Sequence, residues 1–475
     1  MFAGALVIQL PQVQTFLVGK VTENLSEKLD GEIKFEKIHL RPFTTLVLKN
    51  VAIIDKNPVT DPVDPTKETV DTFFQAGYII ARFSLEGLLD PAGIHIRKAY
   101  IADARMNLVL EDGQDTSGKG MDNLSRIFRL KKNQPKKEPS ENEIFHIKNV
   151  EINNMAFALI NYKTRKTPYS GGINWNDLDV KDIDITAEDL HFKAGIMSGH
   201  AERVSFREKS GYRIESISGN ARVGRGKTII ENLKLKDPWS RLDLPEFMMS
   251  YENVKAFKDF ISKVRLDGDI ADSRIDFKTI TYFAPQLEGN RLKAGISGHF
   301  SGYVDNFDVI GLKIASDAGG FTGTINGSMK GLPEIEKTTI DAKIDKFNMT
   351  AEGLGLFLSE WMKDGELDLS RYAKGHTFMV TAKASGPMNS LDVNADIYSL
   401  IGRADADIRL ENMTDSGNPI RISGTAETDD LDIGKFISSE LIGPVTLRTG
   451  LKAEIGKTKS AKIDSLFIDR LNLNN

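Results

Sequence analysis

The sequence alternates apolar and polar residues in stretch after stretch, and this two-residue period restricts the possible folds more than any other feature. In residues 292–304, "LKAGISGHFSGYV", every second residue is apolar or glycine, and most residues between them are polar. The same alternation returns in 378–384, 404–411 and 447–455. A period of two puts one set of side chains on each side of an extended chain, so every such stretch predicts a β-strand with one apolar face.

The number of these stretches predicts a mostly β fold of ~25–30 strands. Open sheets rarely exceed ~10 strands without curling or splitting, which leaves sandwiches, a barrel, a solenoid or one long curved sheet. The predicted helices are few: 11–29, 121–130, 254–264, 354–361 and a short one capped by Asp432. Such helices cannot cover so much sheet. We therefore expect a long, curved, antiparallel-rich β-sheet that forms a taco-like hydrophobic groove, with an N-terminal amphipathic helix, although apolar faces that pack on each other stay an alternative.

Domain limits follow from changes in composition. Residues 1–10 are apolar through Ile8 but too short to span a bilayer, so they are either the end of a membrane anchor or a hydrophobic start that docks on the protein. Residues 11–130 combine the first helix with a β region. The segment 131–143, "KKNQPKKEPSENE", has no apolar residue and predicts a linker. Residues 144–475 form the repeated β-groove region, which we expect to continue past Asn475.

Composition excludes several classes of function. The chain has 62 basic and 67 acidic residues and a net charge of −5, so no large basic field predicts a nucleic-acid partner. It has no cysteine, which excludes disulfides, thiol catalysis and cysteine-ligated metal centres.

Motifs for catalysis or cofactors are weak. The stretch 219–228 resembles a phosphate-binding loop but lacks the first glycine and leads into a strand, so we interpret it as a basic turn. The stretch 267–276 resembles a calcium loop but departs from its ligand pattern. We predict no enzyme, no cofactor and no metal site. None of the seven histidines lies in an HxH or HxxxH pair, so we expect surface histidines: His39, His95, His146, His191, His200, His299 and His376.

Several long stretches resemble the AsmA-like family of Gram-negative envelope proteins, and within it the TamB group of translocation and assembly module subunits. They are "LPQVQTFLVGKVTENLSEKLDGEIKFEKIHLRPFTTLVLKNVAIID", "ARFSLEGLLDPAGIHIRKAYIADARMNLVLEDG", "LKAGISGHFSGYVDNFDVIGLKI", "FTGTINGSMKGLP", "GPVTLRTGLKAEIG" and "AKIDSLFIDRLNLN". The resemblance implies an N-terminal inner-membrane anchor and a periplasmic β-groove that conducts phospholipids between the inner and outer membranes. It also implies an alternative role in outer-membrane protein assembly with a BamA-like partner.

Two functional hypotheses follow from the apolar faces. In the first, a groove contacts phospholipid acyl chains, which bind without directional contacts at ~0.8 kcal/mol per buried methylene. In the second, exposed strand edges pair with client β-strands. The residues predicted to line the groove are Phe83, Leu85, Ile94, Ile96, Met106, Leu108, Ile296, Phe300, Val304, Ile408, Leu410, Leu447, Leu451 and Ile455.

Overall fold

The computed structural model describes most of the chain in two compact units, Met1–Pro238 (unit 1) and Trp239–Asn475 (unit 2). The described residues are 29–41, 44–58, 61, 69–83, 94–114, 120–128, 143–162, 171–285, 288, 292–317, 320–359, 368–414, 418–455 and 461–473. The predicted anchor at 1–10, nearly all of the predicted helix 11–29 and nearly all of the linker 131–143 lie outside them. No helix in these ranges has the length and hydrophobicity that a membrane crossing requires.

The described residues of unit 1 form a sheet with one short helix. Its elements are β1 (Gly31–Lys34), β2 (Lys37–Arg41), β3 (Thr45–Asp55), β4 (Thr72–Phe83), β5 (Ile94–Gln114), β6 (Gly120–Asp122), α4 (Asn123–Ile127), β7 (Glu143–Asn161), β8 (Asp177–Lys193), β9 (Ile196–Glu208), β10 (Arg213–Val223) and β11 (Lys227–Lys236). Both β1 and β2 pair with β3, and the ladder continues through β4, β5, β7, β8, β9, β10 and β11.

One pairing in unit 1 is parallel. β5 and β7 run side by side in the same direction, with Ile94 opposite Phe145 and Leu110 opposite Asn161, whereas the other described ladders of the unit are antiparallel. A parallel pair needs a long connection that returns the chain to its starting end. The predicted linker 131–143 falls in this connection, between two paired strands of one unit, and the division between the two units comes after Pro238.

Unit 2 is a meander in which strands follow one another in chain order. Its elements are β12 (Arg241–Ser250), η1 (Val254–Asp259), α5 (Phe260–Lys263), β13 (Arg265–Asp276), α6 (Phe277–Thr281), β14 (Lys293–Tyr303), β15 (Asn306–Ser316), β16 (Phe321–Lys330), η3 (Ile335–Lys337), β17 (Thr339–Thr350), α7 (Ala351–Ser359), β18 (Thr377–Pro387), β19 (Ser390–Ser399), β20 (Gly402–Glu411), β21 (Ile420–Asp432), α8 (Ile433–Ile437), β22 (Pro444–Ile455) and β23 (Ala461–Leu473). Each strand from β13 to β22 pairs antiparallel with the strands before and after it.

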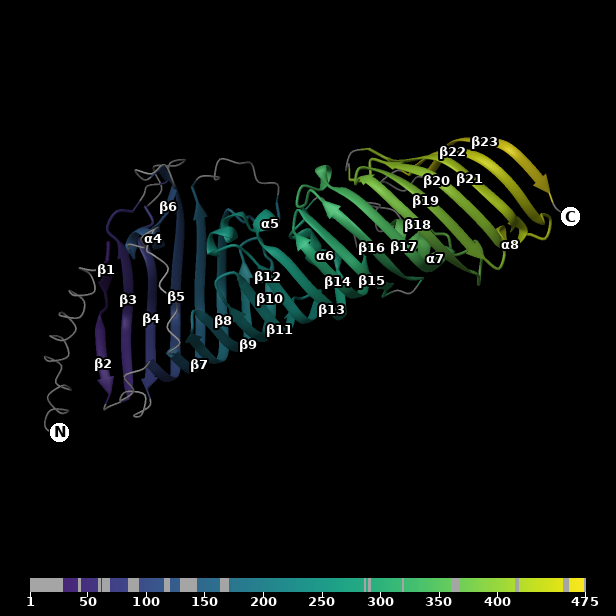
Figure 1. Ribbon diagram of the computed structural model, residues 1–475. Helices are drawn as coiled ribbons and strands as arrows, with labels where there is room; N and C mark the ends of the chain where they lie inside the picture. The colour runs from purple at the N-terminus through teal and green to yellow at the C-terminus, as the bar shows by residue number, and fades with distance from the viewer. Residues whose placement is uncertain are drawn as a thin grey trace, which may run out of the picture. The chain divides into compact units, whose positions relative to one another are not determined.

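The predicted fold class is confirmed: the protein is mostly β, and its strands form open, curved, antiparallel-rich sheet with a few short helices. In Figure 1 the strands of each unit lie side by side in a single curved layer. The helices predicted near 121–130, 254–264 and 354–361 are α4, η1 with α5, and α7. The predicted cap of α8 is also confirmed, because Asp432 Oδ1 accepts a hydrogen bond from Lys435 N at 2.9 Å.

A row of left-handed residues crosses the sheet of unit 1. Asn50, Asp103 and Asn154 have φ values of 50°, 52° and 55°, and they lie at the same level of β3, β5 and β7. Asn154 Nδ2 donates to Asp103 Oδ1 at 2.7 Å. Asparagine and aspartate tolerate this conformation better than other side chains. In β3 the apolar alternation runs through Leu46 and Leu48, and it resumes one residue late, at Val51 and Ile53. The registers from β3 to β7 do not shift at this level, so the neighbouring strands make the same change together.

Candidate functional site

The apolar residues of unit 2 gather on one face of its sheet. Residues directly opposite each other in a ladder point to the same side, so the registers carry this face from strand to strand. Ile408 lies opposite Val393 and Gly424, and Gly424 lies opposite Leu451. Three more rows lie on the same side: Leu391–Leu410–Ile422–Ala453, Ala395–Ala406–Ala426–Thr449 and Ile397–Ala404–Thr428–Leu447. We call this surface the apolar face.

The apolar face continues towards β13. Ala395 lies opposite Ala382, which lies opposite Ile344 of β17. A bulge follows in β17. The next pair after Ile344–Ala382 is Phe347–Val380, so the chain advances three residues along β17 but only two along β18. The extra residue, Lys346, has a φ of 50° and keeps the apolar side chains before and after it on the same face. The face therefore extends over many strands of unit 2.

Aromatic and small residues alternate on this part of the face. The Phe300 ring lies over Gly268, where an added Cβ would come within 2.9 Å of it. The Phe321 and Phe347 rings stack with their centroids 5.4 Å apart. Gly323 lies beneath Phe347 in the same way as Gly268 beneath Phe300. At these two positions glycine makes room for the aromatic ring of the neighbouring strand, which lies over it.

Most of the predicted groove residues lie at apolar positions of the ladders. Ile408, Leu410, Leu447 and Leu451 occupy the rows of the apolar face given above, and Ile296 and Phe300 lie on β14 opposite Ile314 and Val309. Val304 falls in the two-residue turn between β14 and β15. Ile455 pairs with Ile420, and Ile94 pairs with Phe145. The side chains of Ile455 and Ile94 lie outside the described ones, and Leu85 lies entirely outside the described residues.

The predicted residues in unit 1 also pair with apolar partners. Met106 lies opposite Phe74 and Phe157, and Leu108 lies opposite Leu159. Phe83 lies opposite Ile96, which in turn lies opposite Ile147 of β7. The apolar rows of β5 are therefore continued by apolar residues on its neighbours.

None of the predicted groove residues with a described side chain is fully buried. All eleven are half-buried: Phe83, Ile96, Met106, Leu108, Ile296, Phe300, Val304, Ile408, Leu410, Leu447 and Leu451. The inner residues of two packed sheets would form a core about as dense as a protein interior and would lose almost all contact with water. The intermediate exposure of these side chains thus agrees with a sheet whose apolar face is not covered by a second sheet.

Two buried clusters on this face lie where short helices pack on the strand ends. Leu292, Phe321 and Phe347 form a buried cluster, against which Phe277 of α6 packs. A second cluster is formed by Ala351, Ala373 and Ile401, with Phe436 of α8 beside it. Outside these clusters Ala382, Leu391 and Thr449 are also buried on this face, whereas the larger predicted groove residues around them stay half-buried.

The opposite face of the same strands is charged. Asp396 lies opposite Asp405, Asp405 opposite Glu427, and Glu427 opposite Arg448. The hydrogen bond between the two neighbouring carboxyl groups raises the pKa of Asp396. Arg403 Nη2 lies 3.1 Å from Asp405 Oδ1 and 3.9 Å from Asp396 Oδ1, so it partly offsets their repulsion. This face suits water and ions, and apolar ligands would find their contacts on the other.

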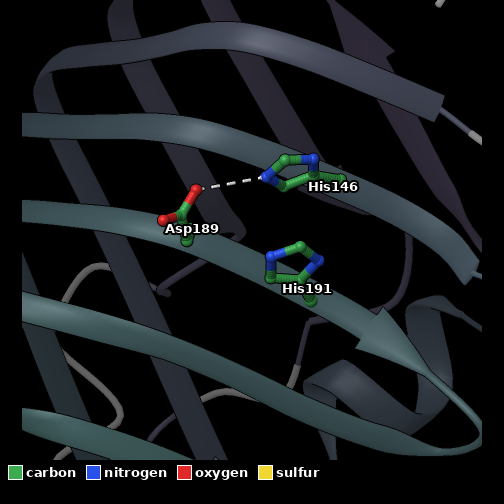
Figure 2. Close-up of side chains that lie close together, drawn as sticks. All are labelled: His146, Asp189 and His191. Carbon is green, nitrogen blue, oxygen red and sulfur yellow. Dashed lines mark hydrogen bonds and ion pairs between the residues drawn. The ribbon is translucent and has the colours of Figure 1, made fainter.

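The histidines of unit 1 are less dispersed than their sequence positions indicate. His95, His146 and His191 lie directly opposite one another on β5, β7 and β8. Figure 2 shows His146 and His191 side by side, with the Asp189 carboxylate next to His146. Ring nitrogens of both histidines and a carboxylate oxygen of Asp189 all lie within 4.8 Å of one another. Among the described residues this is the group that could hold a metal ion.

Comparison of the chain with protein-family models, with curated proteins and with solved structures finds no match. The resemblance to the AsmA-like family therefore stays a prediction. Any function must be argued from the apolar face and the residues around it.

Proposed function

We propose that the protein binds the acyl chains of phospholipids on its apolar face and conducts phospholipids from the inner to the outer membrane along a hydrophobic β-groove. The observation that carries this proposal is the half-buried state of the predicted groove residues, from Ile296 to Leu451 in unit 2. Large apolar surface that stays in contact with water usually marks a binding site for a protein, a membrane or an apolar ligand.

Acyl chains suit this surface better than a ligand with polar groups. The rows of the apolar face consist of aliphatic side chains, alanine, glycine and two threonines, Thr428 and Thr449, so hydrogen-bonding groups are sparse. A flexible hydrocarbon chain needs no directional contacts and gains ~0.8 kcal/mol for each buried methylene. Small residues such as Ala395, Ala406 and Ala426 would leave room for such a chain between larger neighbours.

The proposed setting is the periplasm of a Gram-negative cell, with the N-terminal segment in the inner membrane. This part of the proposal rests on the resemblance to the AsmA-like family and its TamB group. We propose a transfer role without catalysis, since the sequence offers no catalytic motif.

The decisive experiment is site-specific photo-crosslinking combined with mass spectrometry of bound lipid. A photoreactive residue at position 408 or 451 on the apolar face should trap phospholipid in cells. The same photoreactive residue at position 409 of β20 or position 423 of β21, both on the opposite face, should trap little. Purified protein should also carry phospholipid. A folded preparation free of lipid, with equal crosslinking from both faces, would exclude the proposed function.

The alternative is an assembly scaffold that acts with a BamA-like outer-membrane partner. The observation in its favour is an edge: among the described residues β2 pairs only with β3, so the outer side of β2 offers backbone groups that could pair with a client strand. Crosslinkers placed along β2 should then trap unfolded outer-membrane polypeptides. If they trap no polypeptide while position 408 traps lipid, the scaffold function is rejected.

A further inference from the structure

The structure places a potential metal site on the sheet of unit 1, away from the apolar rows. We propose that His146, Asp189 and His191 bind a divalent transition-metal ion that prefers imidazole ligands, such as Zn²⁺, and that the ion links β7 to β8. This inference is independent of the proposed lipid function. It changes the prediction from sequence, which treats these histidines as ordinary surface residues.

Strand register brings the two histidines together. His146 of β7 lies directly opposite His191 of β8 in the antiparallel ladder, and their rings stack with centroids 4.0 Å apart and an angle of 11° between the planes. The His146 side chain has 28% of its surface exposed, so an ion from solution can reach it. Directly opposite residues have Cβ atoms only ~4.5–5.5 Å apart, a spacing from which two imidazoles can share one ion.

A bulge supplies the third ligand. Asp189 precedes His191 by two residues and has a φ of 50°, and the register between β8 and β9 shifts between Glu188 and His191. Bulges commonly redirect a side chain. Here the Asp189 carboxylate lies diagonally across from His146, with Oδ1 3.4 Å from Nε2 (Figure 2).

The distances are compatible with a tetrahedral ion after a small adjustment. Zn–N and Zn–O bonds of ~2.0–2.2 Å place neighbouring ligand atoms ~3.4 Å apart on a tetrahedral ion. The three ligand atoms lie within 4.8 Å of one another, so each distance between them needs to shorten by ~1.4 Å or less for one ion to reach all three. The stacked rings, which are both half-buried, must splay for this. Two imidazoles and one carboxylate leave a fourth position open to water.

A third histidine lies beside the group. His95 of β5 pairs with His146 across the parallel ladder, and the ring centroids are 6.1 Å apart at 90°. It could complete the ligand set or orient His146. The positively charged neighbours are Arg97, Lys148 and Lys193, which lie two residues along the strand from His95, His146 and His191. Their charge weakens cation binding, so the carboxylate of Asp189 is needed to offset it.

The test is Zn²⁺ titration of the whole protein by calorimetry, repeated with His146→Gln, His191→Gln and Asp189→Asn. The unaltered protein should bind one Zn²⁺, and each variant should bind it at least about tenfold more weakly. His376→Gln, which changes a histidine of unit 2, is the matched control and should leave the affinity unchanged. Circular dichroism spectra must show that the variants fold. Mg²⁺, which prefers oxygen ligands, should not compete.

A further readout identifies the ligands. Cu²⁺ bound in place of Zn²⁺ should give an electron paramagnetic resonance spectrum with nitrogen hyperfine splitting, and this splitting should change in His146→Gln. Zn²⁺ binding that is absent, or that survives in a His146→Gln/His191→Gln double variant, overturns the proposal.

Discussion

Ile408→Asp is the substitution that tests the apolar face most directly. Ile408 lies in the middle of β20, opposite Val393 and Gly424, and it is half-buried in the protein alone. A carboxylate at this position would remain hydrated on the open face, so we expect the free energy of unfolding to fall by only ~1–2 kcal/mol, the value of part of one aliphatic side chain. We expect the substitution to weaken the binding free energy of an acyl chain by more than this.

The expected loss of lipid affinity follows from the strand spacing. An acyl chain that avoids the carboxylate gives up about three methylenes of contact, roughly the segment over one strand spacing of ~4.8 Å. At ~0.8 kcal/mol for each methylene, the loss of binding free energy is ~2.4 kcal/mol, which makes the dissociation constant about fiftyfold larger. Titration of a fluorescent phospholipid into the purified, delipidated protein measures this constant, and thermal unfolding followed by circular dichroism measures stability.

Ser423→Asp is the matched control for Ile408→Asp. It adds the same carboxylate to the adjacent strand at nearly the same level, but on the charged face, opposite Arg409 and Lys452. Lipid affinity should be unchanged within about twofold, and the surface charge pairs should alter stability by less than ~1 kcal/mol. Equal lipid affinity of the two variants would refute the assignment of lipid to the apolar face. Loss of folding in Ile408→Asp would instead show that this face is a protein core.

Three other substitutions test other parts of the structure. Arg126→Met removes the partner of Asp55, whose side chain is only 2% exposed, and should lower the free energy of unfolding by ~2–4 kcal/mol in urea denaturation; a change below ~0.5 kcal/mol would contradict the buried ion pair. Asp396→Asn removes a carboxyl group whose pKa is raised by Asp405. Because the pKa of Asp396 is raised, the stability that this group contributes is present at low pH and is lost as pH rises through that pKa. The variant should therefore raise Tm at pH 7 and have less effect near pH 3. The opposite order would contradict this reasoning. Gly298→Ala puts a Cβ at a residue with a φ of 151° and within 2.7 Å of a backbone carbon of β15. We expect the free energy of unfolding to fall by ~1–3 kcal/mol. Wild-type stability would show that the backbone can relax at this register shift between β14 and β15.

The alternation in sequence was sufficient to predict the strands of unit 2 but not their neighbours. Ala404–Ala406–Ile408–Leu410 predicts a strand with one apolar face, and β20 has that pattern of exposure. Which strands lie beside it depends on register, and periodicity alone contains no information about register. The regular meander of unit 2 made the simplest assumption, pairing with the next strand, correct there.

The parts that sequence did not predict come from non-local pairing. The parallel ladder of β5 and β7 places His95 opposite His146, about fifty positions away in the chain, so a search for closely spaced histidines could not find the group. A search for histidines at equal depth in successive apolar–polar alternations would have found it. The helix α6, which follows directly after β13, was not predicted from the sequence either. In the structure Asp276 caps the helix, with Oδ1 accepting from Lys278 N at 2.9 Å.

The meander of unit 2 has a consequence for how its length can vary. From β13 to β22 every strand pairs only with the strands before and after it in the chain, and segments more distant in the chain meet where short helices pack on the strand ends. Repeat proteins with this nearest-neighbour property can gain or lose units while the remaining contacts stay the same. Duplication or deletion of one hairpin between the helix-covered clusters would therefore lengthen or shorten the sheet by two strand widths while the pairing of the other strands stays the same.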